Sequence, residues 1–309
     1  MIIISEFIHP SGLALIEASG LPFQYDPDLW QSDTFYDALQ EANALIVRNQ
    51  TQVNQALLDQ ASCLKVVGRL GVGLDNIDLK TIQDRQIGFV DARGANAASV
   101  AEYVLAALLH FARQLAAADG HVKQGGWDRT AFGGFELRGK TLGLIGLGDI
   151  GLRVARRANA FDMHVMASDP ARHYKEAVIE ENHIQLTSTE DVFTQSDFIS
   201  LHAPLLDSTR QMINETSIAT MKQGVYLINT ARGELIDSLA LSGALVAGQV
   251  GGAVLDVTDP EPLPFDDILN KTPNVWISPH IAGLTEEAQA QVGVQVAEGV
   301  LNILKGLQP

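Results

Sequence analysis

The sequence has little cysteine and little positive charge. Cys63 is the only cysteine in 309 residues, so no disulfide can form within the chain, and a reducing compartment is the expected environment. The chain has 21 Lys and Arg residues against 37 Asp and Glu residues, which gives a formal net charge of −16. Because this charge repels nucleic acids and anionic membrane surfaces, neither is an expected partner.

Uninterrupted apolar runs of membrane-spanning length are also missing. The opening MIIISEF has no basic residue before its apolar run and no room for a signal-peptide core, so it predicts a first β-strand. A longer apolar stretch, residues 100–118, is interrupted by Glu102, His110 and Arg113, which disfavours a membrane span. We therefore expect a soluble protein of the cytoplasm, whose acidity is also compatible with a saline habitat.

The composition and length predict a globular protein of two domains. Hydrophobic residues make up 46% of the chain and charged residues 19%. Short apolar runs alternate with helix-like segments, which predicts parallel sheets with helices on their faces. The strand-like runs are residues 1–4, 44–49, 64–68 and 87–92 and, after a loop at 123–139, residues 140–148, 164–169, 196–204, 224–232, 251–257 and 274–278.

These runs predict an α/β protein with two doubly wound parallel-sheet domains. The six later runs suffice for a complete Rossmann sheet, and the earlier runs predict a flavodoxin-like domain. Residues 100–118 predict one long, largely buried helix, whose start Asn96 and Ser99 could cap. A last helix, about 285–304, should cross back to the first domain. The expected division is therefore 1–98 with 284–309 for the first domain, and 99–283 for the second domain.

A glycine motif follows the first run of the second sheet. Gly146, Gly148 and Gly151 have G-x-G-x-x-G spacing, which alone is common in turns, but here they join a strand to a helix. Such glycines allow a tight turn, close approach to a pyrophosphate and close helix packing. Asp169 ends the next strand, 169 − 151 = 18 residues later, and its carboxylate favours the ribose of NAD over the 2′-phosphate of NADP. Because Arg172 lies nearby in the sequence, NADP stays an alternative cofactor.

Other residues of the expected cofactor site lie in this motif or directly after later strands. Asp149 puts a negative charge beside the expected pyrophosphate, so we expect its side chain to point away while its backbone N–H binds. The remaining assignments are Ile150, Pro204, Ala231 and Asp256. No metal site is expected.

Three charged or titratable residues also lie where strands of the second sheet should end. They are Arg232 in LINTARGELID, Glu261 in GGAVLDVTDPEPLP and His280 in ISPHIAG. Taken singly, each has an ordinary structural explanation: a surface charge, a solvated turn residue and a core histidine. The carboxyl edge of a parallel sheet is nevertheless where such folds place their ligands.

At this point the sequence resembles the D-isomer-specific 2-hydroxyacid dehydrogenase family, and within it the phosphoglycerate dehydrogenases. The resemblance covers nearly the whole chain and is carried by ALIVRNQTQV, VVGRLGVGLDNID, GANAASVAEYVLA, GKTLGLIGLGDIG, NTARGELID and SPHIAG. It implies that Arg232, Glu261 and His280 are the catalytic arginine, glutamate and histidine. It also implies a homodimer formed through the cofactor domains.

The chemistry of these residue types agrees with that implication. An arginine fork can bind the carboxylate of a 2-oxo acid and polarise its carbonyl. When hydride reaches carbon 2, the developing alkoxide needs a proton, which a histidine can donate near neutral pH. A glutamate bonded to the imidazole would favour its charged form and orient the ring, and Pro279 would stiffen the approach to His280.

Residues expected to bind the substrate lie in the first domain. Gly71, Val72 and Gly73 resemble the family loop whose backbone N–H groups receive the substrate carboxylate; an ordinary strand-to-helix turn is the alternative. Three arginines near strand ends suggest a second anionic group on the substrate, such as a phosphate or a sulfonate. They are Arg48, Arg69 and Arg93, although arginines at strand ends are often solvated.

The sequence departs from the family pattern at two positions, and its function has rivals. Thr258 stands where relatives often have phenylalanine, and Arg93 where many have a small residue. With one helix after the second sheet, we expect no C-terminal regulatory domain. We predict an NAD-dependent D-2-hydroxyacid dehydrogenase for a 3-phosphoglycerate-like or sulfolactate-like substrate. The alternatives are a glyoxylate or hydroxypyruvate reductase and, in another class, an NAD(H)-responsive binding protein.

Overall fold

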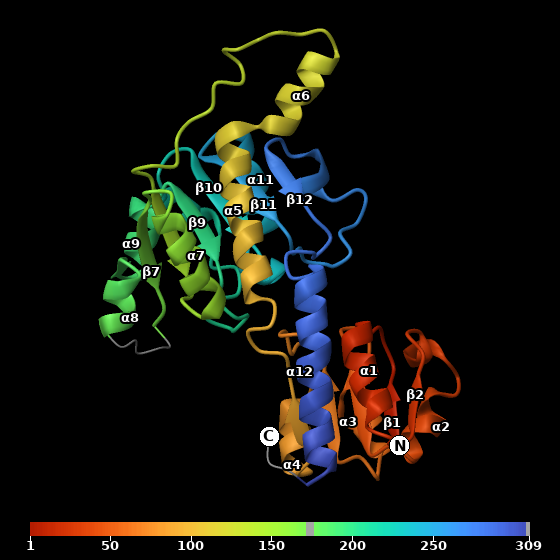
Figure 1. Ribbon diagram of the computed structural model, residues 1–309. Helices are drawn as coiled ribbons and strands as arrows, with labels where there is room; N and C mark the ends of the chain where they lie inside the picture. Colours follow the sequence, from red (N-terminus) through yellow and green to blue (C-terminus); the bar gives the residue numbers. More distant parts are fainter. Residues whose placement is uncertain (171–175, 307–309) are drawn as a thin grey trace. The chain divides into compact units, whose positions relative to one another are not determined.

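The computed structural model describes residues 1–170 and 176–306, and the chain divides into two compact units. Unit 1 comprises Met1–Asn96 and the chain from Gly283 onward, and unit 2 comprises Ala97–Ala282. The boundaries predicted from the sequence, after residues 98 and 283, lie two residues and one residue later than these. Each unit is built on its own parallel sheet (Figure 1).

Unit 1 has a five-stranded parallel sheet of flavodoxin-like order, β2-β1-β3-β4-β5. Every residue of β1 and β3 is buried, as expected for strands covered by helices on both faces. The edge strand β2 was not predicted, because its sequence, FQY, lacks an apolar run. The strands are β1 (Ile2–Ile4), β2 (Phe23–Tyr25), β3 (Ala44–Val47), β4 (Val66–Arg69) and β5 (Gly88–Val90).

The last helix of the chain covers one face of this sheet. On β4, a Cβ added at Gly68 would lie 2.8 Å from the side chains of Val296 and Val300, so α12 packs closely there. Gly12 and Gly293 similarly let the backbones of α1 and α12 approach each other. The helices of unit 1 are α1 (Pro10–Ala18), η1 (Leu29–Gln31), α2 (Phe35–Gln40), α3 (Gln55–Asp59), α4 (Leu79–Asp84) and α12 (Glu286–Leu304).

Unit 2 has a seven-stranded parallel sheet in the order β12-β11-β10-β9-β6-β7-β8. This is the doubly wound order of a Rossmann fold with one additional strand at the β12 edge. The edge strand β8, with the sequence IQL, was not predicted, because two of its three residues are polar or exposed. The strands are β6 (Thr141–Ile145), β7 (His164–Ser168), β8 (Ile184–Leu186), β9 (Phe198–Leu201), β10 (Val225–Asn229), β11 (Val250–Leu255) and β12 (Val275–Ile277).

Two hydrophobic clusters, one containing Leu142 and Leu144 and the other Ile199 and Leu201, bring the sheet of unit 2 together with its helices. The first includes α5 and α7 residues, and the second α11 residues. The helices of unit 2 are α5 (Ala97–Arg113), α6 (Leu115–Lys123), α7 (Asp149–Asn159), α8 (Glu176–Glu181), α9 (Thr189–Gln195), α10 (Glu215–Thr220), η2 (Gly233–Leu235), α11 (Ser238–Val246) and η3 (Ile268–Lys271).

The prediction of one buried helix over residues 100–118 was wrong. The helix α5 starts at Ala97, so Ser99 lies inside its first turn rather than capping it. Gln114 then adopts a left-handed conformation with φ 41°, and α6 begins as a separate helix. No residue of α6 is buried, and Leu115 is 74% exposed. The segment from α6 to residue 134, which we call the arm, extends from α5 in Figure 1.

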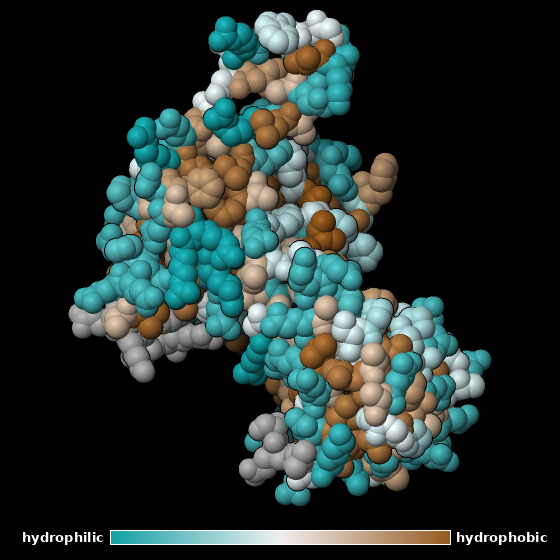
Figure 2. All heavy atoms as spheres, viewed as in Figure 1, coloured by the Kyte–Doolittle hydropathy of each residue, from teal (hydrophilic) through white to brown (hydrophobic). Residues whose placement is uncertain are grey.

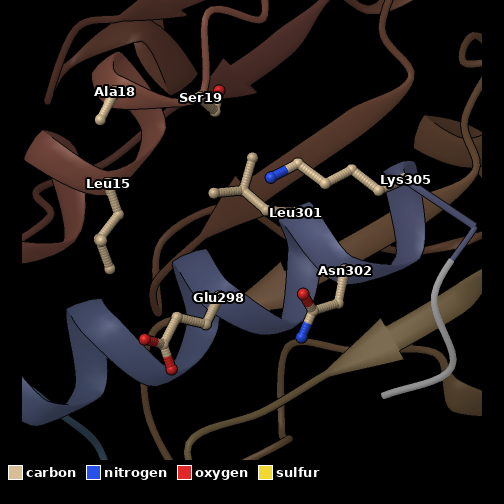
Figure 3. Close-up of a pocket in the computed structure, with 7 residues that line it drawn as sticks. All are labelled: Leu15, Ala18, Ser19, Glu298, Leu301, Asn302 and Lys305. Atoms are coloured by element: carbon tan, nitrogen blue, oxygen red, sulfur yellow. The ribbon is translucent and has the colours of Figure 1, made fainter.

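Two surface hollows lie away from the predicted site residues, none of which lines either one. A hollow of about 450 Å³ in unit 1 is lined by residues of α1 and α12 and by Ser19 and Lys305, which follow these helices (Figure 3). A hollow of about 280 Å³ in unit 2 lies at the amino ends of β9 and β10 and includes Phe135, Lys140 and Tyr226. In the described ranges, no helix combines the length and apolarity required to cross a membrane.

Candidate active site

The glycine motif forms the turn between β6 and α7. Gly146 has φ 92°, and an added Cβ would lie 2.7 Å from the backbone carbonyl of His202, so only glycine fits this turn. Gly148 is the N-cap of α7, whose backbone N–H groups are therefore available to an anion. Gly151 packs against Gly146, because a Cβ there would lie 2.7 Å from the carbonyl oxygen of Gly146.

Asp169 lies beside this glycine turn. Its Oδ2 accepts a hydrogen bond of 2.9 Å from the backbone N–H of Leu147, between the first two glycines. The structure thus brings the turn and the carboxylate together at the carboxyl ends of β6 and β7. This cradle fits a dinucleotide, with the pyrophosphate at the start of α7 and a ribose at Asp169.

The neighbouring residues of the motif have different environments. The Asp149 side chain is exposed in the first turn of α7, and Ile150 packs partly buried against the core. Arg172, the residue that left NADP as an alternative cofactor, lies outside the described residues. Pro204 follows β9, and its carbonyl accepts a hydrogen bond of 2.7 Å from the hydroxyl of Thr209.

His280 and Glu261 form a direct pair at the end of β12. His280 Nδ1 lies 2.9 Å from Glu261 Oε2, and both side chains remain partly exposed. His280 has φ 54°, and its backbone N–H donates to the carbonyls of Asp256 and Ser278, both at 2.9 Å. Glu261 Oε1 also accepts the N–H of Thr258 at 3.2 Å. The imidazole therefore has one ring nitrogen engaged and is carried on a tightly bonded turn.

Asp256 is the centre of that turn. Its carboxylate, in a residue only 1% exposed, accepts the Ser278 hydroxyl at 2.6 Å and the N–H groups of Ile281 and Ala282 at 2.8 Å each. The Tyr103 hydroxyl of α5 bonds the Ser278 oxygen, and because Ser278 donates to Asp256, Tyr103 must be the donor. Burial raises the pKa of Tyr103, the hydrogen bond with Ser278 opposes this shift, and the charge of Asp256 adds to it.

This arrangement adds positioning residues that the sequence did not indicate. Asp256 was assigned to the cofactor, but its oxygens bind three groups of the chain itself, so its contact with a cofactor stays a prediction. Tyr103 and Ser278 were not singled out at all. The only available signal was the hydroxyl residue two positions before His280, and nothing linked it to a tyrosine 175 residues away.

Arg232 lies on the segment after β10, next to the segment that carries Glu261. Asn229 holds this turn, accepting the N–H of Ala231 at 3.0 Å and donating to the carbonyl of Arg232 at 2.8 Å. Arg232 Nη1 donates to the Ala231 carbonyl at 2.6 Å. A Cβ at Gly233 would overlap the backbone of Thr258, so only glycine lets these segments touch. Arg232, Glu261 and His280 are thus on neighbouring segments at one edge of the sheet.

In unit 1, the glycine loop and the three predicted arginines differ in environment. Gly71 has φ 154°, and the guanidinium of Arg69 occupies the space of its absent Cβ while Nη1 donates to the Leu70 carbonyl at 3.0 Å. Val72 and Gly73 complete this partly exposed loop.

Arg48 and Arg93 are held in opposite ways. Arg93 is exposed and pairs with its neighbour Asp91, Nε to Oδ2, at 2.8 Å. Arg48 is partly buried, with its guanidinium 5.6 Å from the ring centre of Phe7. Burial lowers the pKa of Arg48, and the charge of Glu6 opposes that shift. Arg48 and Arg69 are thus both partly buried, whereas Arg93 is exposed.

Comparison with known proteins agrees with the resemblance. A family model described as "D-isomer specific 2-hydroxyacid dehydrogenase, NAD binding domain" matches residues 105–282. The chain is 38% identical over 306 residues to D-3-phosphoglycerate dehydrogenase of Archaeoglobus fulgidus, covering 99% of this chain and 58% of the relative. It is 43% identical over 277 residues to hydroxypyruvate reductase of Thermotoga maritima, covering 89% of each. The chain thus spans less than two thirds of the first relative and most of the second.

Solved structures give the same result. The TT0316 protein of Thermus thermophilus has a TM-score of 0.90 at 31% identity, covering 100% of this chain and 98% of that chain. D-lactate dehydrogenase of Aquifex aeolicus, complexed with NAD and lactic acid, has a TM-score of 0.86 at 30% identity, covering 99% and 95%. The predicted fold class, two parallel-sheet α/β domains, is confirmed.

Proposed function

Because the chain belongs to the D-isomer-specific 2-hydroxyacid dehydrogenase family, we propose that it is an NAD-dependent oxidoreductase that interconverts a small 2-oxo acid and the D-2-hydroxy acid. The observation that carries this proposal is the 2.9 Å pair of His280 and Glu261. A positioned imidazole with a carboxylate partner is an acid–base device, and a protein that only sensed NAD(H) would not need one.

The residues of unit 2 supply the chemistry. NAD(H), when bound, exchanges a hydride with carbon 2 of the substrate. Glu261 engages Nδ1 of His280, which leaves Nε2 to donate a proton to the substrate oxygen in reduction and to take it in oxidation. Arg232 binds the carboxylate and polarises the carbonyl, where a guanidinium stabilises the developing negative charge. In unit 1, the backbone of Gly71–Gly73 is proposed to bind a carboxylate.

The preferred substrate carries a second anionic group, and Arg48 binds it. This proposal rests on the partly buried charge of Arg48, since Arg93 pairs with Asp91 and Arg69 bonds its own loop. A phosphate, as in 3-phosphohydroxypyruvate, or a sulfonate, as in sulfopyruvate, fits an arginine. A hydroxypyruvate or glyoxylate reductase is the second candidate, because the hydroxypyruvate reductase of Thermotoga maritima matches 89% of both chains.

A substrate panel tests these proposals. Initial rates would be measured by NADH absorbance with 3-phosphohydroxypyruvate, sulfopyruvate, hydroxypyruvate and glyoxylate. A charged hydrogen bond is worth about 1.5–3 kcal/mol, so Arg48→Ala should lower kcat/KM roughly 10–100-fold only for 3-phosphohydroxypyruvate and sulfopyruvate, which have a second anionic group. A wild type that prefers glyoxylate, or equal losses on all four acids, would instead favour the second candidate. Activity with none of them would favour a binding protein.

The same assay tests the cofactor. Asp169 should favour NADH, since the 2′-phosphate of NADPH would lie against its carboxylate. Asp169→Ala should narrow the preference. Equal kcat/KM with both cofactors in the wild type would contradict the assignment.

Assembly and location also belong to the proposal. The arm exposes Leu115, Val122 and Trp127 by 74%, 48% and 78%, and Figure 2 shows hydrophobic surface among its polar residues. Large exposed apolar residues on one projecting segment suit a contact with a second copy, so a homodimer through unit 2 is proposed. Sedimentation of Trp127→Glu should then show monomers. A cytoplasmic location is proposed from the single cysteine.

A further inference from the structure

One carboxylate in unit 1 is enclosed by the backbone that carries Arg48. Glu6, which follows β1, is 3% exposed and accepts hydrogen bonds from the N–H groups of four successive residues. Oε1 accepts from Arg48 and Thr51, both at 2.9 Å. Oε2 accepts from Asn49 at 3.0 Å and from Gln50 at 2.9 Å. Four donors on two oxygens suit a carboxylate, which only accepts hydrogen bonds.

The same four residues, which we call the 48–51 loop, are also fixed through their carbonyl groups. The side-chain amide of Asn76 donates to the carbonyls of Arg48 at 3.1 Å and Thr51 at 2.7 Å. The Thr51 hydroxyl bonds that of Ser5 at 3.0 Å. The loop is therefore held on both sides by buried polar groups, which leaves its backbone little freedom.

Glu6 also shapes the surroundings of the Arg48 side chain. Phe7, the residue after Glu6, lies under the guanidinium at 5.6 Å. Burial lowers the pKa of Arg48, and the charge of Glu6 counters this effect. Glu6 thus fixes the backbone of Arg48 and, through its charge, helps the partly buried guanidinium to remain charged.

The four N–H groups of the loop could in principle receive an anionic ligand themselves. Glu6 already occupies them, so a ligand on this side must be bound by the side chain of Arg48. A purely structural role for Glu6 would be to join β1 to the end of β3, and the distances alone agree with either role.

We infer that Glu6 is a positioning residue that sets the affinity for the second anionic group of the substrate by holding Arg48. This inference rests on the proposed function, in which Arg48 binds that group. Glu6 does not touch the substrate, because its two oxygens already bind the N–H groups of the loop, so its effect should appear in KM rather than in kcat.

A double-mutant cycle separates positioning from structural support. Glu6→Gln retains the size of the side chain, but its amide group faces N–H donors, so the loop and Arg48 should shift. We expect KM for 3-phosphohydroxypyruvate to rise about 10-fold with kcat unchanged. KM and kcat for glyoxylate should stay within about twofold of the wild type. In the Arg48→Ala background, Glu6→Gln should cause no further loss, since its effect acts through Arg48.

Binding provides a second measurement. In calorimetric titrations of 3-phosphoglycerate into the enzyme with NADH, the affinity should fall about 10-fold in Glu6→Gln and stay unchanged in Asp78→Asn. Asp78 is a matched control, because it is a carboxylate of unit 1 that caps α4 through Thr81, at 3.0 Å, without contacting the loop. If Glu6→Gln does not fold, Asn76→Ala loosens the same loop from its carbonyl side and should cause the same selective rise in KM.

The outcomes distinguish the inference from the proposed function. Glu6→Gln could lower kcat/KM equally for 3-phosphohydroxypyruvate and glyoxylate, or add its loss to that of Arg48→Ala. Either result would make Glu6 a structural residue and overturn the inference. An unchanged KM in a folded Glu6→Gln would do the same, provided that Arg48→Ala alone shows the selective loss. If Arg48→Ala shows no selectivity, the second-anion proposal itself has failed.

Discussion

Replacing Asp256 by Asn should disturb both the stability of unit 2 and the chemistry of His280. The wild-type carboxylate accepts three hydrogen bonds, from Ser278, Ile281 and Ala282, in a residue that is 1% exposed. An asparagine has nearly the same shape but only one acceptor oxygen. If that oxygen keeps the Ser278 and Ile281 donors, the amide NH₂ faces the N–H of Ala282, and two donors meet.

The cost follows from the count of bonds. The unsatisfied N–H of Ala282 costs about 1–3 kcal/mol, and two charge-assisted bonds become ordinary bonds at a loss of roughly 1 kcal/mol in total. We therefore expect unfolding free energy to fall by about 2–4 kcal/mol, which for a domain of this size lowers Tm by roughly 5–15 °C. If the altered turn displaces His280, kcat should fall on the order of 10–100-fold.

Both effects can be measured on one preparation. Calorimetry gives Tm, and single-turnover oxidation of NADH gives the chemical rate. Asp237→Asn is the matched control, because Asp237 caps α11 through Leu239 and Ala240, and asparagine caps a helix equally well. The reasoning is refuted if Asp256→Asn keeps Tm within about 2 °C and its rate within about twofold, while Asp237→Asn behaves in the same way.

Three further predictions concern the same unit. His280→Ala should lose roughly 10²–10⁴-fold in kcat while its Kd for NADH, from fluorescence titration, stays unchanged; a wild-type rate with chemistry limiting would exclude a proton-donor role. Gly146→Ala should weaken NADH binding at least about 10-fold, since its Cβ meets backbone at 2.7 Å, whereas Gly243→Ala, with open space around it, should bind normally. Burial lowers the pKa of His202 from 6.5 to about 4, so between these values the unfolded chain binds the extra proton and stability falls as pH falls. Since His202 keeps some solvent contact, we expect a loss of about 1–3 kcal/mol from pH 7 to pH 4 in urea titrations and a smaller loss in His202→Asn; equal losses would contradict the assignment.

The sequence predicted the elements whose signals are local. A buried parallel strand such as β3, with the sequence ALIV, is a continuous apolar run, and the glycine motif has its own spacing, so both could be identified. The edge strands β2 and β8 are short and partly polar, and they form only because a neighbouring strand offers hydrogen bonds. The break at Gln114 also has no local signal, since neither glycine nor proline marks it.

The positioning residues could not be predicted for a related reason. Their bonds join residues far apart in sequence: Glu6 reaches a loop 42 to 45 residues away, and Tyr103 reaches Ser278. Arg232, Glu261 and His280 were named from motifs, but their roles remain predictions until the variants are measured. The 2.9 Å pair of His280 and Glu261 is the part of that set for which the structure adds a contact.

The insertion of unit 2 within unit 1 has a consequence for synthesis on the ribosome. All of unit 2 is translated before α12, whereas the sheet of unit 1 must wait for α12 to cover Gly68 and to meet Gly12. Unit 1 thus pairs segments about 280 residues apart, and such non-local contacts form slowly. A nascent chain stopped after unit 2 should carry a folded, protease-resistant Rossmann domain beside an incomplete first sheet, and that sheet is where chaperones should bind.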